Sequence, residues 1–139
     1  MAGPFAKWAG DLRKGRLGAQ KATLQYIDLV AGRVLARAVR NAPSVTGALR
    51  RSGRIEEKGN LANPIRILSF GGKGTGVQYA AAVEFGRFVP RGRQRGSTTT
   101  PQPYLRPALL EEMKRSRGDM KKVLVANWRH LNKTYGGKV

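Results

Sequence analysis

The side chains that could act as acids, bases or nucleophiles are few and poorly spaced for catalysis. The single histidine, His130, lies near the end of an expected helix and has no nucleophile motif around it. The adjacent pairs Glu56–Glu57 and Glu111–Glu112 do not form a paired-carboxylate site, because neighbouring side chains point apart on a strand or a helix. These patterns predict a protein without enzymatic activity.

The residue types also argue against a metal or nucleotide site. With one histidine and no cysteine, the chain cannot build a zinc cluster. The glycine-rich segment 71–76 could aim backbone N–H groups at a phosphate, but a Walker loop needs Gly-Lys-Ser/Thr, and here Lys73 is followed by Gly74. We interpret this segment as a flexible hairpin tip and predict no cofactor.

The strongest chemical signal is a surplus of positive charge. The chain has 27 Lys and Arg against 8 Asp and Glu, a net charge of +19 spread over both halves of its 139 residues. Such a surface repels itself unless an anionic partner compensates it. The length predicts a single domain over residues 1–139. Because no apolar leader and no long apolar run is present, we expect a soluble, unexported protein without membrane contact.

The densest basic segment is an expected long loop over residues 86–101, rich in glycine and polar residues. Its four arginines have no acidic neighbour in the sequence, and they are the candidate contacts for nucleic acid or a partner: Arg87, Arg91, Arg93 and Arg95. A solvated linker whose arginines only confer solubility remains the alternative.

Helical periodicity predicts a long first helix over residues 19–41, which Pro43 ends. Gly15 and Gly18 disfavour its extension upstream, so residues 1–18 are expected to be loosely ordered. The helix exceeds the expected diameter of the domain, and Tyr26 and Val30 lie on a side that a small sheet does not cover. We therefore expect these two residues to contact a neighbouring subunit.

The rest of the chain predicts a small sheet and a second helix. Candidate strands cover 50–58 and 65–70, while 77–83 is ambiguous between strand and helix. Pro107 opens a helix that continues to about residue 133. The expected fold is α+β, with a long N-terminal helix, an antiparallel sheet of three to four strands, and a C-terminal helix packed on the sheet.

Three segments in fixed order carry a resemblance: residues 41–52, 79–86 and 101–109. Written loosely as APxxTGxLRxS, YAxxVEFG and QPFLRPAL, they resemble a family of small tailed-phage head–tail connector and tail-completion proteins of the neck. With the flanking helices, the resemblance covers about residues 20–133. The chain departs from the family pattern after Gly86, where Arg87 stands in place of a common threonine and a longer loop follows.

The resemblance implies a structural virion protein that forms a homo-oligomeric ring, expected to be six-fold, between the DNA-filled head and the tail. Its partners would be phage adaptor or stopper proteins, tail proteins, and genomic DNA bound without sequence preference in the channel. It would be located in the virion, in the neck or at the upper end of the tail, after assembly in the bacterial cytoplasm. Within the matched segments, Glu84 is expected to pair with Arg106 or with an arginine of the next subunit, with a solvent-exposed Glu84 as the alternative.

Charge alone supports a second interpretation, a free nucleic-acid-binding protein of the ribosomal or nucleoid type without sequence specificity. No signature of a known nucleic-acid-binding module accompanies the charge.

Overall fold

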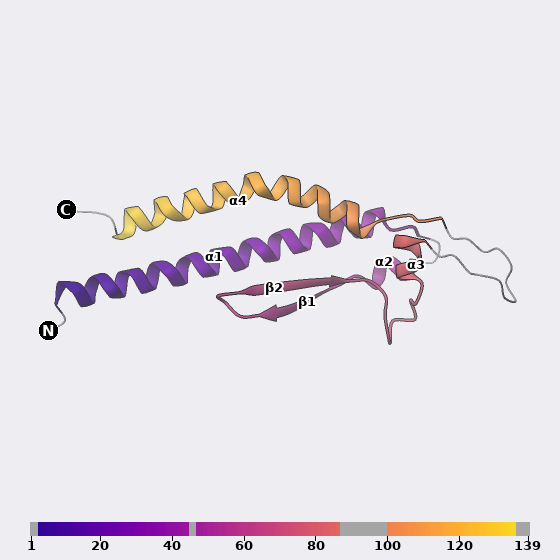
Figure 1. The fold of residues 1–139 in the computed structure, drawn as a ribbon, viewed down its shortest axis with the longest axis horizontal. Coiled ribbons are helices and arrows are strands. Elements are labelled where there is room, and N and C mark those ends of the chain that lie inside the picture. The colour runs from indigo at the N-terminus through magenta and orange to yellow at the C-terminus, as the bar shows by residue number, and fades with distance from the viewer. Residues whose placement is uncertain (1–2, 45–46, 87–99, 136–139) are drawn as a thin grey trace, which may run out of the picture.

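The protein is elongated, with two long helices that run antiparallel along its length (Figure 1). The computed structural model describes residues 3–44, 47–86 and 100–135. A β-hairpin lies along the other side of the first helix, and two short helices lie at one end of the molecule (Figure 1). The mixed helix-and-sheet class predicted from the sequence is confirmed, but its details differ.

The first helix, α1, spans Pro4–Asn41 and is much longer than the sequence predicts. Residues 4–18, expected to be loosely ordered, form its first part, so the two glycines do not stop it. Proline at its first position suits a helix start, because that position has no intrahelical partner for an N–H group. The predicted end is confirmed at Asn41, where the Ala42 N–H still bonds the Ala38 carbonyl before Pro43 follows.

The sheet has two strands in the described part of the chain, fewer than the predicted three to four. After the short helix α2, Ala48–Arg51, strand β1 spans Arg54–Gly59 and pairs antiparallel with β2, Pro64–Ser69. The ambiguous segment 77–83 is not a strand. Val77 makes a single bridge to Gly72, and helix α3 follows at Ala80–Phe85. The helix propensity of three consecutive alanines decides the ambiguity.

The last helix, α4, spans Leu105–Tyr135 and packs along α1. The prediction that this helix packs on the sheet is wrong. Helix α1 lies between α4 and the hairpin (Figure 1). The side of α4 that is buried begins with Tyr104, just before the helix, and continues through Ala108 and Glu112. Leu109 and Met113, which stand at helical spacing in the sequence, are 44% and 45% exposed. Small and polar side chains therefore line much of the α1–α4 contact, and apolar periodicity does not identify them.

The hydrophobic core lies where the C-terminal end of α1 meets the start of α4. Its buried members come from α1, α2, α3 and the start of α4, together with the residues next to these helices: Val34, Ala38, Ala42, Leu49, Val77, Ala80, Tyr104 and Ala108. The core is small for the length of the helices. Away from it, the two helices depend on polar contacts with each other.

Two exposed helical glycines offer a simple test of the helix boundaries. A Cβ at Gly18 in α1 or at Gly118 in α4 would have no heavy atom within 4 Å. Alanine there should stabilise the protein by about 0.5–1 kcal/mol at each position, because it restricts the unfolded backbone and favours helix. Urea unfolding followed by circular dichroism measures this gain.

The matched control is Gly71→Ala. Gly71 has a φ of +68°, and a Cβ would lie 2.4 Å from the Val77 carbonyl oxygen. This variant should be clearly destabilised. If Gly18→Ala also destabilises the protein, residue 18 does not belong to a regular helix.

Candidate functional site

The three segments that resemble the phage family meet at one end of the molecule. We call their contact region the junction and define it by Ala42, Leu49, Ala80, Glu84 and Tyr104. Four of these residues belong to the single hydrophobic core, and Glu84 is 7% exposed beside them. The segments are far apart in the sequence, so their convergence is a property of the fold.

The Glu84 carboxylate of α3 holds the start of α4. Its Oε2 accepts hydrogen bonds from the backbone N–H groups of Tyr104 at 2.8 Å and Leu105 at 3.0 Å, and its Oε1 accepts one from Arg106 at 2.9 Å. The first N–H groups of a helix have no partner inside the helix. Pro107 has no N–H group, so this one carboxylate serves every donor from residue 104 to 107.

The surroundings of Glu84 favour its charged form. Burial raises its pKa, but the hydrogen bonds from the three backbone N–H groups and the positive charge of Arg106 lower it more strongly, so the pKa lies below its ordinary value. A negative charge at this position also complements the dipole of α4. The carboxylate thus acts as a fixed anion that caps the helix.

The structure changes the role expected for Glu84 and Arg106. Glu84 is not solvent-exposed, and it bonds the backbone of Arg106 rather than the guanidinium group. Because three N–H groups of its own chain surround the carboxylate, an arginine of another subunit is not needed to neutralise it. The Arg106 side chain is exposed and remains a predicted contact for another subunit.

Tyr104 closes the junction on its other side. Its ring meets the Phe70 ring edge-on with 5.0 Å between centroids, and its hydroxyl lies 3.5 Å from the Ala80 carbonyl oxygen. Burial, and secondarily the nearby Glu84 charge, raises the pKa of Tyr104 to about 12. The phenol therefore stays neutral at physiological pH and acts here as a packing group with a weak polar contact.

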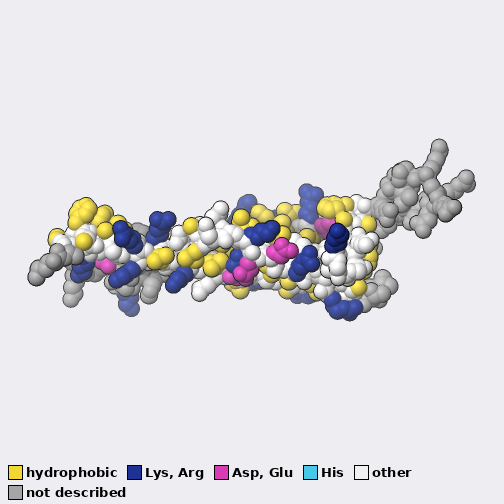
Figure 2. Space-filling view, turned by 90° about the horizontal axis from the view of Figure 1, so that it is seen from below, with side chains coloured by type: hydrophobic (Ala, Val, Ile, Leu, Met, Phe, Trp, Pro, Cys, Tyr) yellow, Lys and Arg dark blue, Asp and Glu magenta, His cyan; other side chains and the backbone are white. Residues whose placement is uncertain are grey.

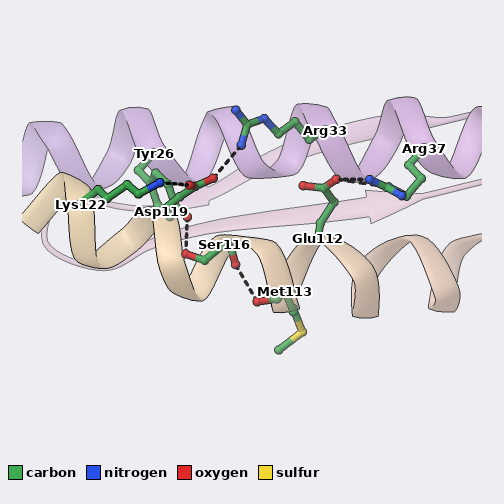
Figure 3. A network of polar contacts seen from close by, with 8 residues as sticks. All are labelled: Tyr26, Arg33, Arg37, Glu112, Met113, Ser116, Asp119 and Lys122. Atoms are coloured by element: carbon green, nitrogen blue, oxygen red, sulfur yellow. Dashed lines mark hydrogen bonds and ion pairs between the residues drawn. The ribbon is translucent and has the colours of Figure 1, made fainter.

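A row of polar contacts joins α1 to α4 away from the junction (Figure 3). Arg37 bonds the Glu112 carboxylate from its Nε at 3.2 Å and its Nη2 at 2.8 Å, and its Nη1 contacts Glu111. One turn along α1, Arg33 pairs with Asp119 at 3.4 Å. These pairs fix how the two helices lie beside each other.

Glu112 is the most deeply buried acid in this row. It is 2% exposed, and its Oε2 is buried with no hydrogen-bond partner, while both hydrogen bonds from Arg37 go to Oε1. The hydrogen bond with Glu112 raises the pKa of Arg37; burial opposes this, and the Glu111 charge adds to it. Sequence reasoning missed this pair, although Arg33 and Arg37 stand one helical turn apart on one side of α1.

Tyr26 is buried within the chain, and Val30 is partly buried there. Tyr26 is 6% exposed, and its hydroxyl donates a 2.7 Å hydrogen bond to the Ser116 carbonyl of α4 (Figure 3). Val30 packs against the hydrophobic core. The reason for expecting a subunit contact was an uncovered side of α1, but α4 covers that side. The basis of the predicted subunit contact is therefore absent, because both residues contact their own chain.

The acidic side chains are almost all used within the chain. All eight lie in the described residues, and seven of them have a basic or backbone N–H partner there: Asp28, Glu56, Glu57, Glu84, Glu111, Glu112 and Asp119. Most of the acidic side chains in view gather over the middle of the molecule, whereas Lys and Arg extend along its length (Figure 2). The outer surface is consequently dominated by positive charge.

The other sequence candidates divide into two groups. The arginines at 87, 91, 93 and 95 lie outside the described residues. Segment 71–76 forms a tight turn in which Gly72 pairs with Val77, and the Thr75 hydroxyl bonds the Gly72 carbonyl at 2.8 Å. The backbone groups of Gly72 and Val77 bond within this turn, which is the arrangement expected of a hairpin tip.

Neither a metal site nor a membrane span is found in the part of the chain that the structure describes. No three His, Asp or Glu side chains within residues 3–44, 47–86 and 100–135 are placed to hold a metal ion. No helix in these ranges is both long and apolar enough to cross a bilayer. Comparison of the chain with protein-family profiles, curated proteins and solved structures returned no match.

Proposed function

We propose that this chain is a structural virion protein of a tailed bacteriophage that forms a ring in the neck between head and tail, without enzymatic activity. The observation that carries the proposal is the junction: the three segments that resemble the neck-protein family fold against one another. Three matching segments on separate surfaces would support the family resemblance only weakly. Three matching segments that build one contact region support it more strongly.

Direct contacts within and between the segments support this interpretation. The Arg50 Nε donates to the Ala42 carbonyl at 2.9 Å, which closes the first segment on itself. The Gln102 N–H donates to the Val83 carbonyl at 2.8 Å, beside the Glu84 contacts, and so joins the second segment to the third.

The distribution of charge supports an anionic environment for the ring. Because the acids are used within the chain, copies brought side by side would repel, and DNA in the channel or acidic faces of neck and tail proteins would offset that repulsion. Arg87, Arg91, Arg93 and Arg95 are the proposed contacts for that DNA or those partners. Arg106 is the proposed contact for another subunit.

The deciding experiment has two parts. Native mass spectrometry of the purified protein, alone and with short duplex DNA, should show a closed ring, and electron microscopy of phage lacking this gene should show heads and tails that fail to join. A strictly monomeric protein together with normal virions from the disrupted phage would contradict the proposal.

A second candidate, a free nucleic-acid-binding protein without sequence specificity, is favoured by the basic outer surface of both helices. Both candidates predict DNA binding that weakens with salt, with a slope of about 0.9 in log affinity against log salt for each neutralised phosphate. Replacing Arg91, Arg93 and Arg95 with Ser should flatten this slope by about 2 to 3 if each meets one phosphate.

Titration at several salt concentrations measures the slope, and Lys58→Ser, on the hairpin, is the control for a single lost charge. An unchanged slope in the triple variant would remove these arginines from the DNA contact. Tight RNA binding by a monomer would favour the second candidate over the virion ring.

A further inference from the structure

An apolar stripe at the N-terminal end of α1 lies open in the structure. It consists of Phe5, Trp8 and Leu12, which are 79%, 59% and 55% exposed. The Phe5 and Trp8 rings contact each other with 5.7 Å between centroids. Hydrophobic surface is visible at the end of the molecule where α1 begins (Figure 2).

The stripe lies on the side of α1 that faces α4. Positions 5, 8 and 12 follow the three-and-four spacing of one helix face, and positions 26, 30, 33 and 37 continue that face. The contacts of Tyr26 with Ser116 and of Arg37 with Glu112 show that this face meets α4. The stripe is thus an extension of an established helix–helix contact.

Helix α4 ends before α1 does, so it does not run along the whole stripe. Counted from the Tyr26–Ser116 contact or from the Arg37–Glu112 contact, α1 extends past the last residue of α4 by about 5 to 15 Å, at 1.5 Å per residue. Figure 1 shows α1 continuing beyond the end of α4. In the part of the chain that the structure describes, the stripe therefore begins on the portion of α1 that extends past α4.

Charge around the stripe selects the partner. Arg13 and Arg16 lie along one side of the stripe, Asp11 lies along the other, and the exposed Arg129 and Lys133 lie on the last turns of α4. A second copy would bring these four basic residues and a single acid, and the excess of positive charge would repel it. Nucleic acid would be drawn to the lysines at positions 7, 14 and 21, whose seven-residue spacing places them on the side of α1 opposite the stripe, and would leave the stripe uncovered.

We propose that the stripe binds an amphipathic helix of a partner protein whose apolar face is flanked by Asp and Glu, laid along α1 in the line of α4. Leu, Phe or Met of the partner would cover Trp8 and Leu12, and its carboxylates would meet Arg13 and Arg16. The inference stands on the geometry of α1 and α4 and does not depend on the function proposed above.

The test uses the full chain and a fluorescein-labelled synthetic peptide of about five helical turns, with Leu on one face and Glu on the others. Fluorescence anisotropy should show saturable binding that weakens as salt is raised. Leu12→Glu should weaken binding by about tenfold or more, the equivalent of one buried apolar side chain. Leu17→Glu is the matched control, because Leu17 is also on α1 and 49% exposed but lies off the stripe.

Several results would overturn the proposal. The first is that the Glu peptide does not bind. The second is that a scrambled peptide, or a peptide with Lys in place of Glu, binds as tightly as the Glu peptide. The third is that Leu12→Glu and Leu17→Glu weaken binding equally. Sedimentation showing a dimer that Leu12→Glu disrupts would assign the stripe to a second copy. Binding to phosphatidylserine vesicles that is lost in the same variant would assign it to a membrane surface. Circular dichroism of each variant checks that the exposed substitutions leave the helices intact.

Discussion

Replacing Glu84 with Gln should destabilise the protein by about 2 to 4 kcal/mol. The carboxylate accepts three backbone N–H hydrogen bonds while 7% exposed, and the Gln side chain offers one acceptor oxygen and an amide that faces the donors. At least one N–H group at the start of α4 would then be buried without a partner. Urea unfolding at neutral pH measures the loss. Glu56→Gln, on the exposed side of β1, is the control and should change stability by less than about 0.5 kcal/mol.

The same variant should change how stability depends on pH. Because the pKa of Glu84 is lowered in the folded state, its contribution is fully present above the ordinary carboxyl value of 4.5 and is lost as the pH falls through the lowered pKa. Acid unfolding of the wild-type protein should therefore steepen below about pH 4.5, and Glu84→Gln should lack that part of the slope. Parallel acid profiles for the two proteins would contradict the capping role.

Replacing Arg37 with Leu should have a comparable or larger effect. The substitution would leave the Glu112 carboxylate, which is 2% exposed, without either of its hydrogen bonds. A buried carboxylate that loses its cationic partner is strongly destabilising, because its charge is left without compensation. The loss should appear as a lower midpoint of urea unfolding, with α4 partly detached from α1.

Replacing Glu112 instead of Arg37 should lower the stability of the protein much less. Glu112→Leu leaves Arg37 with Glu111 and access to water, and it removes the unpartnered Oε2. The double variant Arg37→Leu/Glu112→Leu should recover most of the stability that Arg37→Leu loses, as apolar replacement of both members of a buried pair often does. If the double variant is as unstable as Arg37→Leu, the cost arises from lost packing of the arginine rather than from the stranded charge.

The parts of the fold that were predictable from the sequence are those with a local cause. Pro43 ends α1, Pro107 lies in the first turn of α4, and the strand expected at 65–70 is found at Pro64–Ser69. The start of α1 was not predictable, because isolated glycines lower helix propensity without forbidding a helix. The orientation of α4 was not predictable either. Its inner side begins with Tyr104, Ala108 and Glu112, which apolar periodicity does not select.

The candidate site was likewise predictable from the sequence only in part. Glu84 stood out as the only acid in a long basic stretch, but its partners are backbone N–H groups, which no residue type reveals. The Arg37–Glu112 pair joins residues 75 positions apart and depends on how two helices pack. Its contribution could be inferred only after the helices were placed. The predicted subunit contact of Tyr26 rests on a C-terminal helix placed on the sheet, whereas α4 packs along α1 and covers this residue.

The length of α1 gives the protein a mechanical property that follows from its shape. With 38 residues at 1.5 Å each, the helix is about 57 Å long, and its C-terminal end is anchored in the core at Ala38 and Ala42. A tilt of about 5° at that anchored end would sweep the distal tip through about 5 Å, close to one turn of helix. Because Arg33 and Arg37 tie α1 to α4, such a tilt would move the two helices together. Small adjustments of side-chain packing around Ala38 and Ala42 would thus be geometrically amplified at Phe5 and Trp8.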